Sequence, residues 1–478
     1  MRGLMAAGAC IAAAMLQAGE LKVGFARTDI TPPLGVSMPG YYQVRHAKEI
    51  LDPLSINCLA FSDGKTTAFL MQVDTMCLSA WVADRMRDAI GKATGVGRDA
   101  IMMHASHTHD GGGLSMNLRR GNAVLNTDVD ELTRLYVDMA VTRAADATVK
   151  AVRDLKSAKL SYQRSEAKRI SFGRRYRMKD GKVRTNPGTN NPDIVGPAGN
   201  PPDEEVQVLR IDREGGKPIC LINFQTHPDV VGGETITADW PGLARTVFEA
   251  ATLGKTHCIV INGTQGDVNH CNVMPRPGEL NGLKRDFDDV DRGYSHAWHM
   301  ANVVASAALS KWLKCIPLEA GPVKTATTAV RVPSQRPNAK ELEWAKDVWA
   351  KHEAGKDAEL PWKGMELTTE VARAGRMLRL ENGPDFFDLP LIGIAIGKSV
   401  AFGGFPGEPF NEIGKAVKRN SPFTLTVPAC LVNGSRGYFP FSDAYTQGGY
   451  ESATSPFGPT VADDLIKGQG ELMQKLYR

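Results

Sequence analysis

Several motifs that identify large enzyme classes are missing from this chain of 478 residues. No G-x-G-x-x-G follows a strand-like run and no Walker loop is present, which argues against dinucleotide-binding and P-loop proteins. No G-x-S-x-G elbow is present, so the signature of an α/β-hydrolase is missing as well. None of the eight cysteines belongs to a C-x-x-C motif.

The chain also lacks a strong excess of charge and any long apolar run. Its 57 Lys and Arg residues stand against 53 Asp and Glu, a net charge of +4, without a dense Lys/Arg tract. This balance does not indicate a nucleic-acid partner. With 42% apolar and 23% charged residues, the composition excludes a collagen, a disordered chain and a multi-span membrane protein. The length allows one large α/β domain with insertions, or two or three domains.

A short apolar run lies at the N-terminus, from Leu4 to Leu16, after the positive charge of Arg2. Together with the small residue Ala18, it predicts a signal peptide over residues 1–18 and a secreted or periplasmic protein. The run is too short for a stable membrane span. A buried N-terminal helix is the alternative interpretation.

Seven cysteines remain after residue 18, an odd number that cannot all form pairs. Most of them lie in apolar, strand-like runs, so we interpret them as small core residues. One disulfide is compatible with the sequence, although a chain of this length does not need one.

Strand-like runs and helical periodicities alternate along the chain, without a second break in the core. The order predicts an α/β fold with an α+β tendency: one large domain over residues 19–478, with a mixed sheet flanked by helices. Residues 336–385 are polar, charged and helical in period, and we interpret them as a helical insertion. Strands are expected at 21–26, 56–61, 67–73, 100–105, 206–211, 219–224, 259–262, 391–396, 400–403 and 425–432, and helices at 83–94, 130–153, 241–251, 294–313, 412–418 and after 460.

Three polar loops follow strand-like runs, where catalytic loops commonly lie. The first contains His107 and His109, followed by three glycines. Two histidines at i and i+2 on an extended segment point to the same side, so one can bind a metal with the other beside it. The second loop contains His227, and the third covers residues 262–270. Such loops predict a crevice site, with solvated histidines as the alternative.

Two further segments belong to the candidate site. Glu408 lies in a Pro-Gly-Glu turn that opens a helix. A carboxylate there can complete a metal shell, and it is equally typical of a charge at a helix N-terminus. Residues 433–451 are rich in turns and contain Tyr438, Tyr445 and Tyr450, a composition that is common in surface lids.

In this order, the motifs resemble those of the neutral/alkaline non-lysosomal ceramidase family, and specifically its catalytic N-terminal domain. The opening segment 24–33 also resembles the start of that family, and the likeness covers nearly the whole mature chain as spaced motifs. The motifs are Ser-His-Thr-His with glycines at 106–113, the strand-end His227, Asn-x-x-x-Gly-Asp-Val at 262–268, Pro-Gly-Glu at 406–408 and Gly-Tyr-Glu at 449–451.

The resemblance implies a zinc ion bound by two histidines, a glutamate and a tyrosine, which is a plausible zinc shell. It also implies active-site roles for three further residues: one general acid or base and two groups that stabilise negative charge. The implied zinc ligands are His107, His227, Glu408 and Tyr438, the acid or base is His109, and the charge-stabilising groups are Tyr450 and Arg174.

Two departures from the family change the expected reaction. The family's serine nucleophile falls on Asn269, and an amide side chain cannot attack a carbonyl. The family's C-terminal immunoglobulin-like domain is not expected here either. We therefore expect zinc-bound water to hydrolyse an amide or ester, on a substrate other than ceramide. The expected substrate-binding residues are Asn269, Asp267, Gly112, Arg175 and Arg436.

Two other functions stay open. Because an arginine-rich cleft suits a carboxylate, the same zinc site could serve a carbohydrate-active enzyme such as a uronate polysaccharide or oligosaccharide lyase. A catalytically inactive zinc-containing binding protein is the other alternative. The expected partner is a small-molecule, lipid-derived or oligosaccharide substrate, with no nucleic acid and no stable membrane span.

Overall fold

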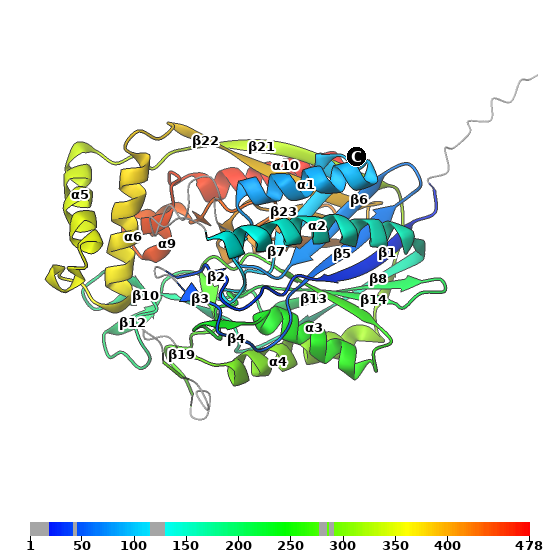
Figure 1. Cartoon of the computed structure of the whole chain (residues 1–478), viewed down its shortest axis with the longest axis horizontal. Coiled ribbons are helices and arrows are strands. Elements are labelled where there is room, and N and C mark those ends of the chain that lie inside the picture. The colour runs from blue at the N-terminus through cyan, green and yellow to red at the C-terminus, as the bar shows by residue number, and fades with distance from the viewer. Residues whose placement is uncertain (1–18, 42–44, 115–129, 277–283, 286–290) are drawn as a thin grey trace, which may run out of the picture.

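Two β-sheets pack face to face, and helices cover the outer side of each, so the layers follow the order helix, sheet, sheet, helix (Figure 1). The computed structural model describes residues 19–41, 45–114, 130–276, 284–285 and 291–478. The predicted signal peptide and Cys10 lie outside the described residues. The expected single α/β domain with a mixed sheet flanked by helices is confirmed.

The larger sheet has nine strands in the spatial order β16-β14-β13-β8-β1-β5-β6-β7, with β20 beside β8. The pairs β6–β7 and β14–β16 are parallel, whereas β1 and β5 pair antiparallel over eight residues. The strands are β1 (Lys22–Asp29), β5 (Ser55–Ser62), β6 (Thr67–Val73), β7 (Ile101–Ala105), β8 (Lys156–Glu166), β13 (Glu205–Arg213), β14 (Ile219–Phe224), β16 (His257–Asn262) and β20 (Ile316–Leu318).

The smaller sheet has the order β21-β22-β23-β25 and lies against the larger one. Apolar side chains of both sheets form a shared core, in which the rings of Phe61 and Phe402 stack with centroids 5.6 Å apart. The expected strands 391–396 and 400–403 are present and form the antiparallel pair β22–β23, and β23 pairs in parallel with β25. The strands are β21 (Val323–Pro333), β22 (Phe386–Ile396), β23 (Val400–Gly404) and β25 (Leu425–Ala429).

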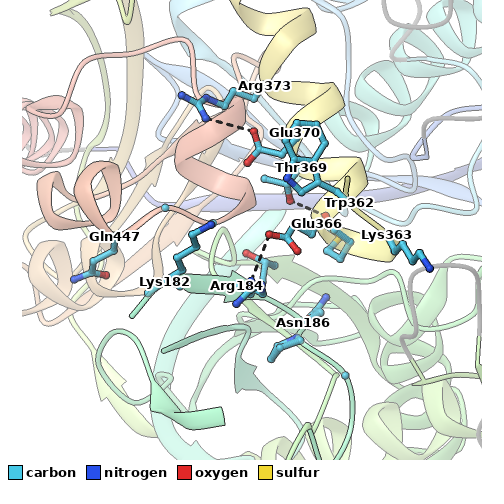
Figure 2. A pocket seen from close by; sticks show the side chains of 18 residues that line it. Lys182, Arg184, Asn186, Trp362, Lys363, Glu366, Thr369, Glu370, Arg373 and Gln447 are labelled. Atoms are coloured by element: carbon cyan, nitrogen blue, oxygen red, sulfur yellow. Dashed lines mark hydrogen bonds and ion pairs between the residues drawn. The ribbon is translucent and has the colours of Figure 1, made fainter. Parts of the chain in front are cut away.

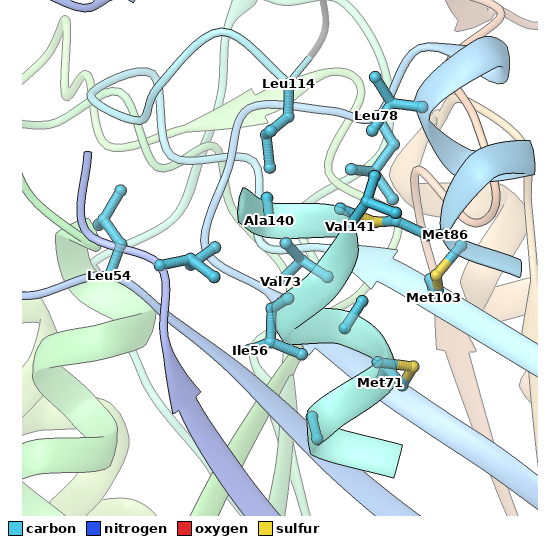
Figure 3. Packing of buried hydrophobic residues seen from close by; sticks show 14 of the residues in the cluster. Leu54, Ile56, Met71, Val73, Leu78, Met86, Met103, Leu114, Ala140 and Val141 are labelled. Atoms are coloured by element: carbon cyan, nitrogen blue, oxygen red, sulfur yellow. The ribbon is translucent and has the colours of Figure 1, made fainter. Parts of the chain in front are cut away.

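Amphipathic helices cover the outer faces because each has one apolar side to bury. α1 (Ala80–Thr94) and α2 (Glu131–Arg153) pack over β5, β6 and β7, and Figure 3 shows this core, to which Ile56, Met71 and Val141 belong. Four further helices cover the sheets. They are α3 (Asp239–Ala251) and α4 (Tyr294–Trp312) over β13, β14 and β16, and α7 (Asn411–Asn420) and α10 (Val461–Tyr477) over the smaller sheet.

Two helices occupy the segment between β21 and β22, at one end of the molecule (Figure 1). They are α5 (Ala339–Glu353) and α6 (Gly364–Leu380), joined through the short helix η2 (Asp357–Glu359). The Arg376 side chain of α6 donates a hydrogen bond to the carbonyl oxygen of Ala453, at 2.9 Å. This contact attaches the helical segment to α9 (Tyr450–Thr454), which lies beside the candidate site.

Short strands and turns connect these layers. They are β2 (Ser37–Met38), β3 (Arg45–His46), β4 (Glu49–Ile50), β9 (Phe172–Gly173), β10 (Arg175–Met178), β11 (Val183–Thr185), β12 (Ile194–Pro197), β15 (Thr235–Ile236), β17 (Val268–Asn269), β18 (Lys284–Arg285), β19 (Asp291–Arg292), β24 (Glu408–Pro409), β26 (Tyr438–Phe439), η1 (Arg98–Ala100) and α8 (Ser442–Gln447).

The structure differs from the sequence-based prediction in some strands. β8 and β21 were not expected, because both are polar along much of their length and owe their conformation to pairing with neighbouring strands. The expected strand 425–432 ends at Ala429, because Leu431 has φ +49° and cannot continue an extended strand.

No disulfide bond links any two of the seven cysteines among the described residues, and six of the seven are buried. Their position agrees with the interpretation as core residues. Within the described part of the chain, no helix combines the length and apolarity that crossing a membrane requires.

Close contact between β1 and α2 generates a stability prediction. A Cβ atom on Gly24 would lie 1.8 Å from the carbonyl oxygen of Ala151, so Gly24→Ala should lower the free energy of unfolding by about 1–3 kcal/mol. Urea unfolding followed by circular dichroism measures this change. The matched control is Gly470→Ala in α10. No atom of a neighbouring segment lies within 4 Å of the Cβ atom added there, so no loss of stability is expected. Equal midpoints for G24A and the unmodified protein would contradict the packing.

Candidate metal centre

Loops at the ends of strands bring the predicted metal ligands together. His107 follows β7, and His227 follows β14. Glu408 begins β24, which pairs in parallel with β26 so that Glu408 lies opposite Tyr438. The pairing of short strands after β23 and β25 therefore determines the separation of the glutamate and the tyrosine.

Asn262, at the end of β16, fixes the two histidine loops relative to each other. Its side-chain amide donates hydrogen bonds to the carbonyl oxygens of Ser106, at 3.1 Å, and Thr226, at 3.2 Å. Its backbone N–H donates to Nε2 of His104, whose Nδ1 donates to the carbonyl oxygen of Cys430. One asparagine and one buried histidine thus connect the segments from which the site is built.

The conformation of the His-x-His segment differs from the one expected. His107 has φ +77°, so the segment turns instead of continuing as an extended strand. The prediction that alternation along a strand aligns the two histidines is therefore wrong. Their rings nevertheless meet edge to face with centroids 4.8 Å apart, because the turn brings His109 back over His107.

Three imidazoles and one carboxylate converge on a single point. Nε2 of His107 lies 3.3 Å from Oε2 of Glu408, and Nε2 of His227 lies 3.1 Å from the same oxygen. Nε2 of His109 is 3.3 Å from Nε2 of His107. The ligand nitrogens of the three histidines all lie within 4.8 Å of one another.

These separations fit a zinc ion. Bonds of about 2.0–2.1 Å at tetrahedral angles place neighbouring ligand atoms about 3.3 Å apart. The measured 3.1 and 3.3 Å separations correspond to that spacing. Glu408 Oε2 is buried and has no hydrogen-bond donor in the described part of the chain, as expected for an oxygen that faces a cation. The residues present therefore suit the zinc ion that the sequence resemblance implies.

Hydrogen bonds at the other ring nitrogen distinguish the three histidines. Nδ1 of His107 donates to the carbonyl oxygen of Met76 at 2.8 Å, and Nδ1 of His227 donates to that of Gln265 at 2.8 Å. Such bonds place the proton on Nδ1, so that Nε2 carries the lone pair that a metal can bind. They are typical of metal-binding histidines. Among the described residues, Nδ1 of His109 has no hydrogen-bond partner. This pattern favours His107 and His227 as ligands and leaves His109 free to exchange a proton.

Burial and mutual charge determine the protonation of the cluster. Burial alone would raise the pKa of Glu408, but His107 and His227 hold that pKa well below its usual range. Burial, together with the positive charge of neighbouring groups, lowers the pKa of His109 and of His227. A charged carboxylate beside neutral imidazoles is the form that binds a divalent cation.

Tyr438 and Arg174 lie on one side of the cluster. The Tyr438 ring stacks near His227 with centroids 6.4 Å apart, and its hydroxyl interacts with the Arg174 guanidinium. Glu451 is fully buried and accepts a hydrogen bond from Nε of Arg174 at 2.6 Å. Nη1 of Arg174 lies 3.3 Å from Nε2 of His227. Glu451 therefore orients the arginine so that one amino group faces the cluster.

A small cavity of about 70 Å³ opens beside these groups. Tyr450 borders it, with its ring 5.7 Å from that of Tyr438. His109 and Arg174 also border it, so the three residues predicted to be catalytic share one space. The full lining is Gly40, Tyr41, His109, Arg174, Thr185, Asn186, His227, Asp229, Arg292, Met365, Thr368, Tyr438 and Tyr450.

Two residues predicted to bind substrate lie behind this cavity. Asn269 is fully buried, and its amide donates a hydrogen bond at 3.1 Å to Oδ1 of Asn186, which does border the cavity. Asp267 accepts a hydrogen bond from the backbone N–H of Asn411, the first residue of α7, at 2.6 Å. Burial raises the pKa of Asp267 to about 6. Both residues support the loops that carry the site.

The other three lie farther from the cavity. Gly112 packs against the ring of Tyr136, where an added Cβ would come within 2.4 Å. Arg175 donates a hydrogen bond to the carbonyl oxygen of Gly448 at 2.9 Å and so holds the loop before Tyr450. Arg436 is exposed. Direct substrate contact by these residues stays a prediction.

Sequence reasoning did not identify some residues at the cavity. Asp229, only two positions after His227, lies 3.3 Å from Nδ1 of His270 and 3.5 Å from Nη1 of Arg292. Burial would raise the pKa of Asp229, but these cationic groups hold it well below its usual range. Glu451 was visible within the Gly-Tyr-Glu motif, whereas nothing in the local sequence indicates Arg292.

Removal of a metal ligand is expected to abolish metal binding. His107→Ala or His227→Ala should lower zinc affinity by about a hundredfold or more, because even outer-shell changes cost about ten- to a hundredfold. Zinc per chain after dialysis, measured by mass spectrometry, tests this. His352→Ala in α5, far from the cluster, is the control. Full zinc content in folded H107A and H227A would contradict the assignment of these two histidines as zinc ligands.

His104 generates a pH prediction. Burial lowers its pKa from 6.5 to about 4. The folded state therefore favours neutral His104, and its contribution to stability is complete above pH 6.5 and is lost as the pH falls towards 4. The loss reaches about 3 kcal/mol. The difference in unfolding free energy between the unmodified protein and His104→Gln should shrink between pH 7.5 and 5, in urea titrations. A constant difference would contradict this assignment.

Comparison with known proteins places the fold. No protein-family model and no curated protein matches the sequence. Among solved structures, neutral ceramidase from Pseudomonas aeruginosa is similar, with a TM-score of 0.71 and 17% identity over 96% of this chain and 74% of that chain. A ceramidase complexed with C2 is similar too, with a TM-score of 0.69 and 15% identity over 95% and 75%. The chain therefore has a ceramidase-like fold.

Proposed function

We propose that this protein is an exported, zinc-dependent hydrolase that cleaves an amide or ester with water, and not a serine, as the attacking group. The observation that carries the proposal is the 3.1–3.3 Å spacing of imidazole nitrogens around the Glu408 carboxylate, beside a cavity. The fold shared with neutral ceramidases supports a hydrolase. The apolar segment 4–16, typical of a signal peptide, supports export.

Four side chains would hold the zinc ion: His107, His227, Glu408 and Tyr438. When bound, zinc lowers the pKa of water and polarises a substrate oxygen. Support for the first three comes from their mutual distances and, for the histidines, from the carbonyl partners of Nδ1. Support for Tyr438 comes from its register opposite Glu408 and its stacking on His227.

His109 is the proposed proton carrier. Its ring borders the cavity, and its Nδ1 has no hydrogen-bond partner among the described residues. The imidazole takes a proton from the water molecule as it attacks the carbonyl carbon, and then gives that proton to the leaving amine or alcohol. Residue 40 lies close to this ring, because a Cβ atom on Gly40 would come within 3.0 Å of Nδ1 of His109.

Arg174 and Tyr450 are the proposed oxyanion-stabilising groups. Attack places a negative charge on the former carbonyl oxygen, and a fixed guanidinium lowers the energy of that state. Glu451 and the carbonyl oxygen of Gly266 hold Nε and Nη2 of Arg174 at 2.6 and 2.7 Å, and Nη1 lies 3.3 Å from Nε2 of His227, where the guanidinium borders the cavity. Tyr450 lies across the same cavity.

No covalent intermediate on residue 269 is proposed. Asn269 cannot act as a nucleophile, and its amide nitrogen is hydrogen-bonded to Asn186, while its amide oxygen accepts from the backbone N–H of Cys271. Water is therefore the attacking group that this proposal requires.

Elimination from a uronate is the second candidate, and one observation favours it: a larger cavity beside the site is lined by lysines and arginines. Product analysis separates the alternatives. Incubation of the zinc-loaded protein with N-acyl amides and esters should release free amine, alcohol or acid. A new ultraviolet-absorbing double bond in uronate oligosaccharides would instead support the lyase. Binding without any product would support an inactive binding protein.

Replacement of the proton carrier should separate metal binding from turnover. His109→Gln is expected to keep its zinc and to reduce kcat by about 10²- to 10⁴-fold, because a positioned acid or base contributes that much. Zinc content and kcat are measured on the same sample, with His352→Gln as the control. Loss of zinc in H109Q would make His109 a ligand, and unchanged kcat would remove it from the mechanism.

A further inference from the structure

A cavity of about 480 Å³ adjoins the metal centre, and Figure 2 shows its side chains. It lies between β11, the N-terminal half of α6 and the loop before α9. Thr185, Asn186 and Met365 line both this cavity and the small one at the cluster. The two cavities are therefore neighbours, and the volume of the larger one lies within the roughly 300–1,000 Å³ typical of small-molecule sites.

The charge of the lining favours an anion. Four cationic and two acidic side chains line the cavity. Arg184 lies 2.8 Å from Asp180 and 3.5 Å from Glu366, so its charge is already balanced. Arg373 pairs in the same way with Glu370, at 3.4 Å. The remaining two, Lys182 and Lys363, are exposed and form no ion pair within the described part of the chain.

The apolar part of the lining includes the indole ring of Trp362. Trp362 is half-buried and lines the cavity, with its ring held edge to face by Trp344 at 6.2 Å between centroids. An indole face presents a large apolar contact area on which the C–H face of a sugar ring can pack. A long acyl chain would instead meet six charged side chains among the 18 residues of the lining.

We propose that this cavity is a subsite for an acidic saccharide, which carries the amide or ester that is cleaved at the metal centre. Separate anionic groups of the saccharide face Lys182 and Lys363, which lie on opposite sides of the cavity in Figure 2, and a sugar ring packs on Trp362. This inference rests on the proposed hydrolase function. Because α6 and the residues before it supply one wall, the helical segment between β21 and β22 determines the substrate class, while the strand-end loops supply the chemistry.

Direct binding tests the subsite without turnover. Tetragalacturonate is titrated into the zinc-loaded protein by isothermal calorimetry at low salt, with cellotetraose as the neutral comparison and N-hexanoylsphingosine as the lipid comparison. The double variant Lys182→Gln/Lys363→Gln should raise the Kd for tetragalacturonate about fivefold, and added salt should reduce the difference. Trp362→Ala should weaken binding of both tetrasaccharides. The matched control is Lys65→Gln/Lys159→Gln, two exposed lysines elsewhere, which should bind normally.

The outcomes separate this subsite from the proposed function. Tetragalacturonate that binds in a lysine-dependent way supports the subsite, and if no acylated or esterified saccharide is cleaved, only the hydrolase proposal fails. Cleavage of lipid amides with no tetragalacturonate binding would overturn the subsite and leave the hydrolase intact. Equal Kd values for tetragalacturonate in the lysine variant and in the unmodified protein would also overturn it.

Discussion

The burial of the Glu408 carboxylate among imidazoles is the constraint on which the site depends. A charged carboxylate in a low-dielectric interior is unfavourable unless positive charge or donors surround it. Here the nearest groups are Nε2 atoms of His107 and His227, at 3.3 and 3.1 Å. Both rings use their Nδ1–H for backbone carbonyls, which points their lone pairs at the carboxylate. A cation between these atoms would satisfy all of them at once.

Rigid supports around this point come from residues with no direct chemical role. Asn262 fastens the two histidine loops, and Glu451 fastens Arg174. Both are fully buried and use their polar atoms on the site's own segments. Their arrangement keeps the reacting groups in place before substrate arrives, which is the condition under which fixed charges stabilise a transition state effectively.

Under the proposed function, chemistry and specificity come from different parts of the molecule. The similarity to neutral ceramidase covers 96% of this chain, so it is not limited to the two packed sheets. The helical pair α5–α6 stands at one end and α6 lines the larger cavity, so in this proposal the surface that selects a substrate belongs in part to a segment outside both sheets (Figure 1). Trp362 and Lys363 line only the larger cavity, so a change there would alter the ligand and leave the cavity at the metal cluster unchanged.

The sequence alone determined the α/β class and the positions of the long helices and most apolar strands, because apolar periodicity is a local property. The strand-end motifs, through the family resemblance, placed His107, His227 and Glu408 in one site, whereas the packing of two sheets was not predicted. Tertiary structure decided what local pattern cannot encode. The polar strands β8 and β21 form through pairing with neighbouring strands. His107 has φ +77° and turns the chain. Asp267 accepts a hydrogen bond from Asn411, and Gly112 packs against Tyr136. Only spatial contact between distant segments created the cavity that α6 and β11 enclose.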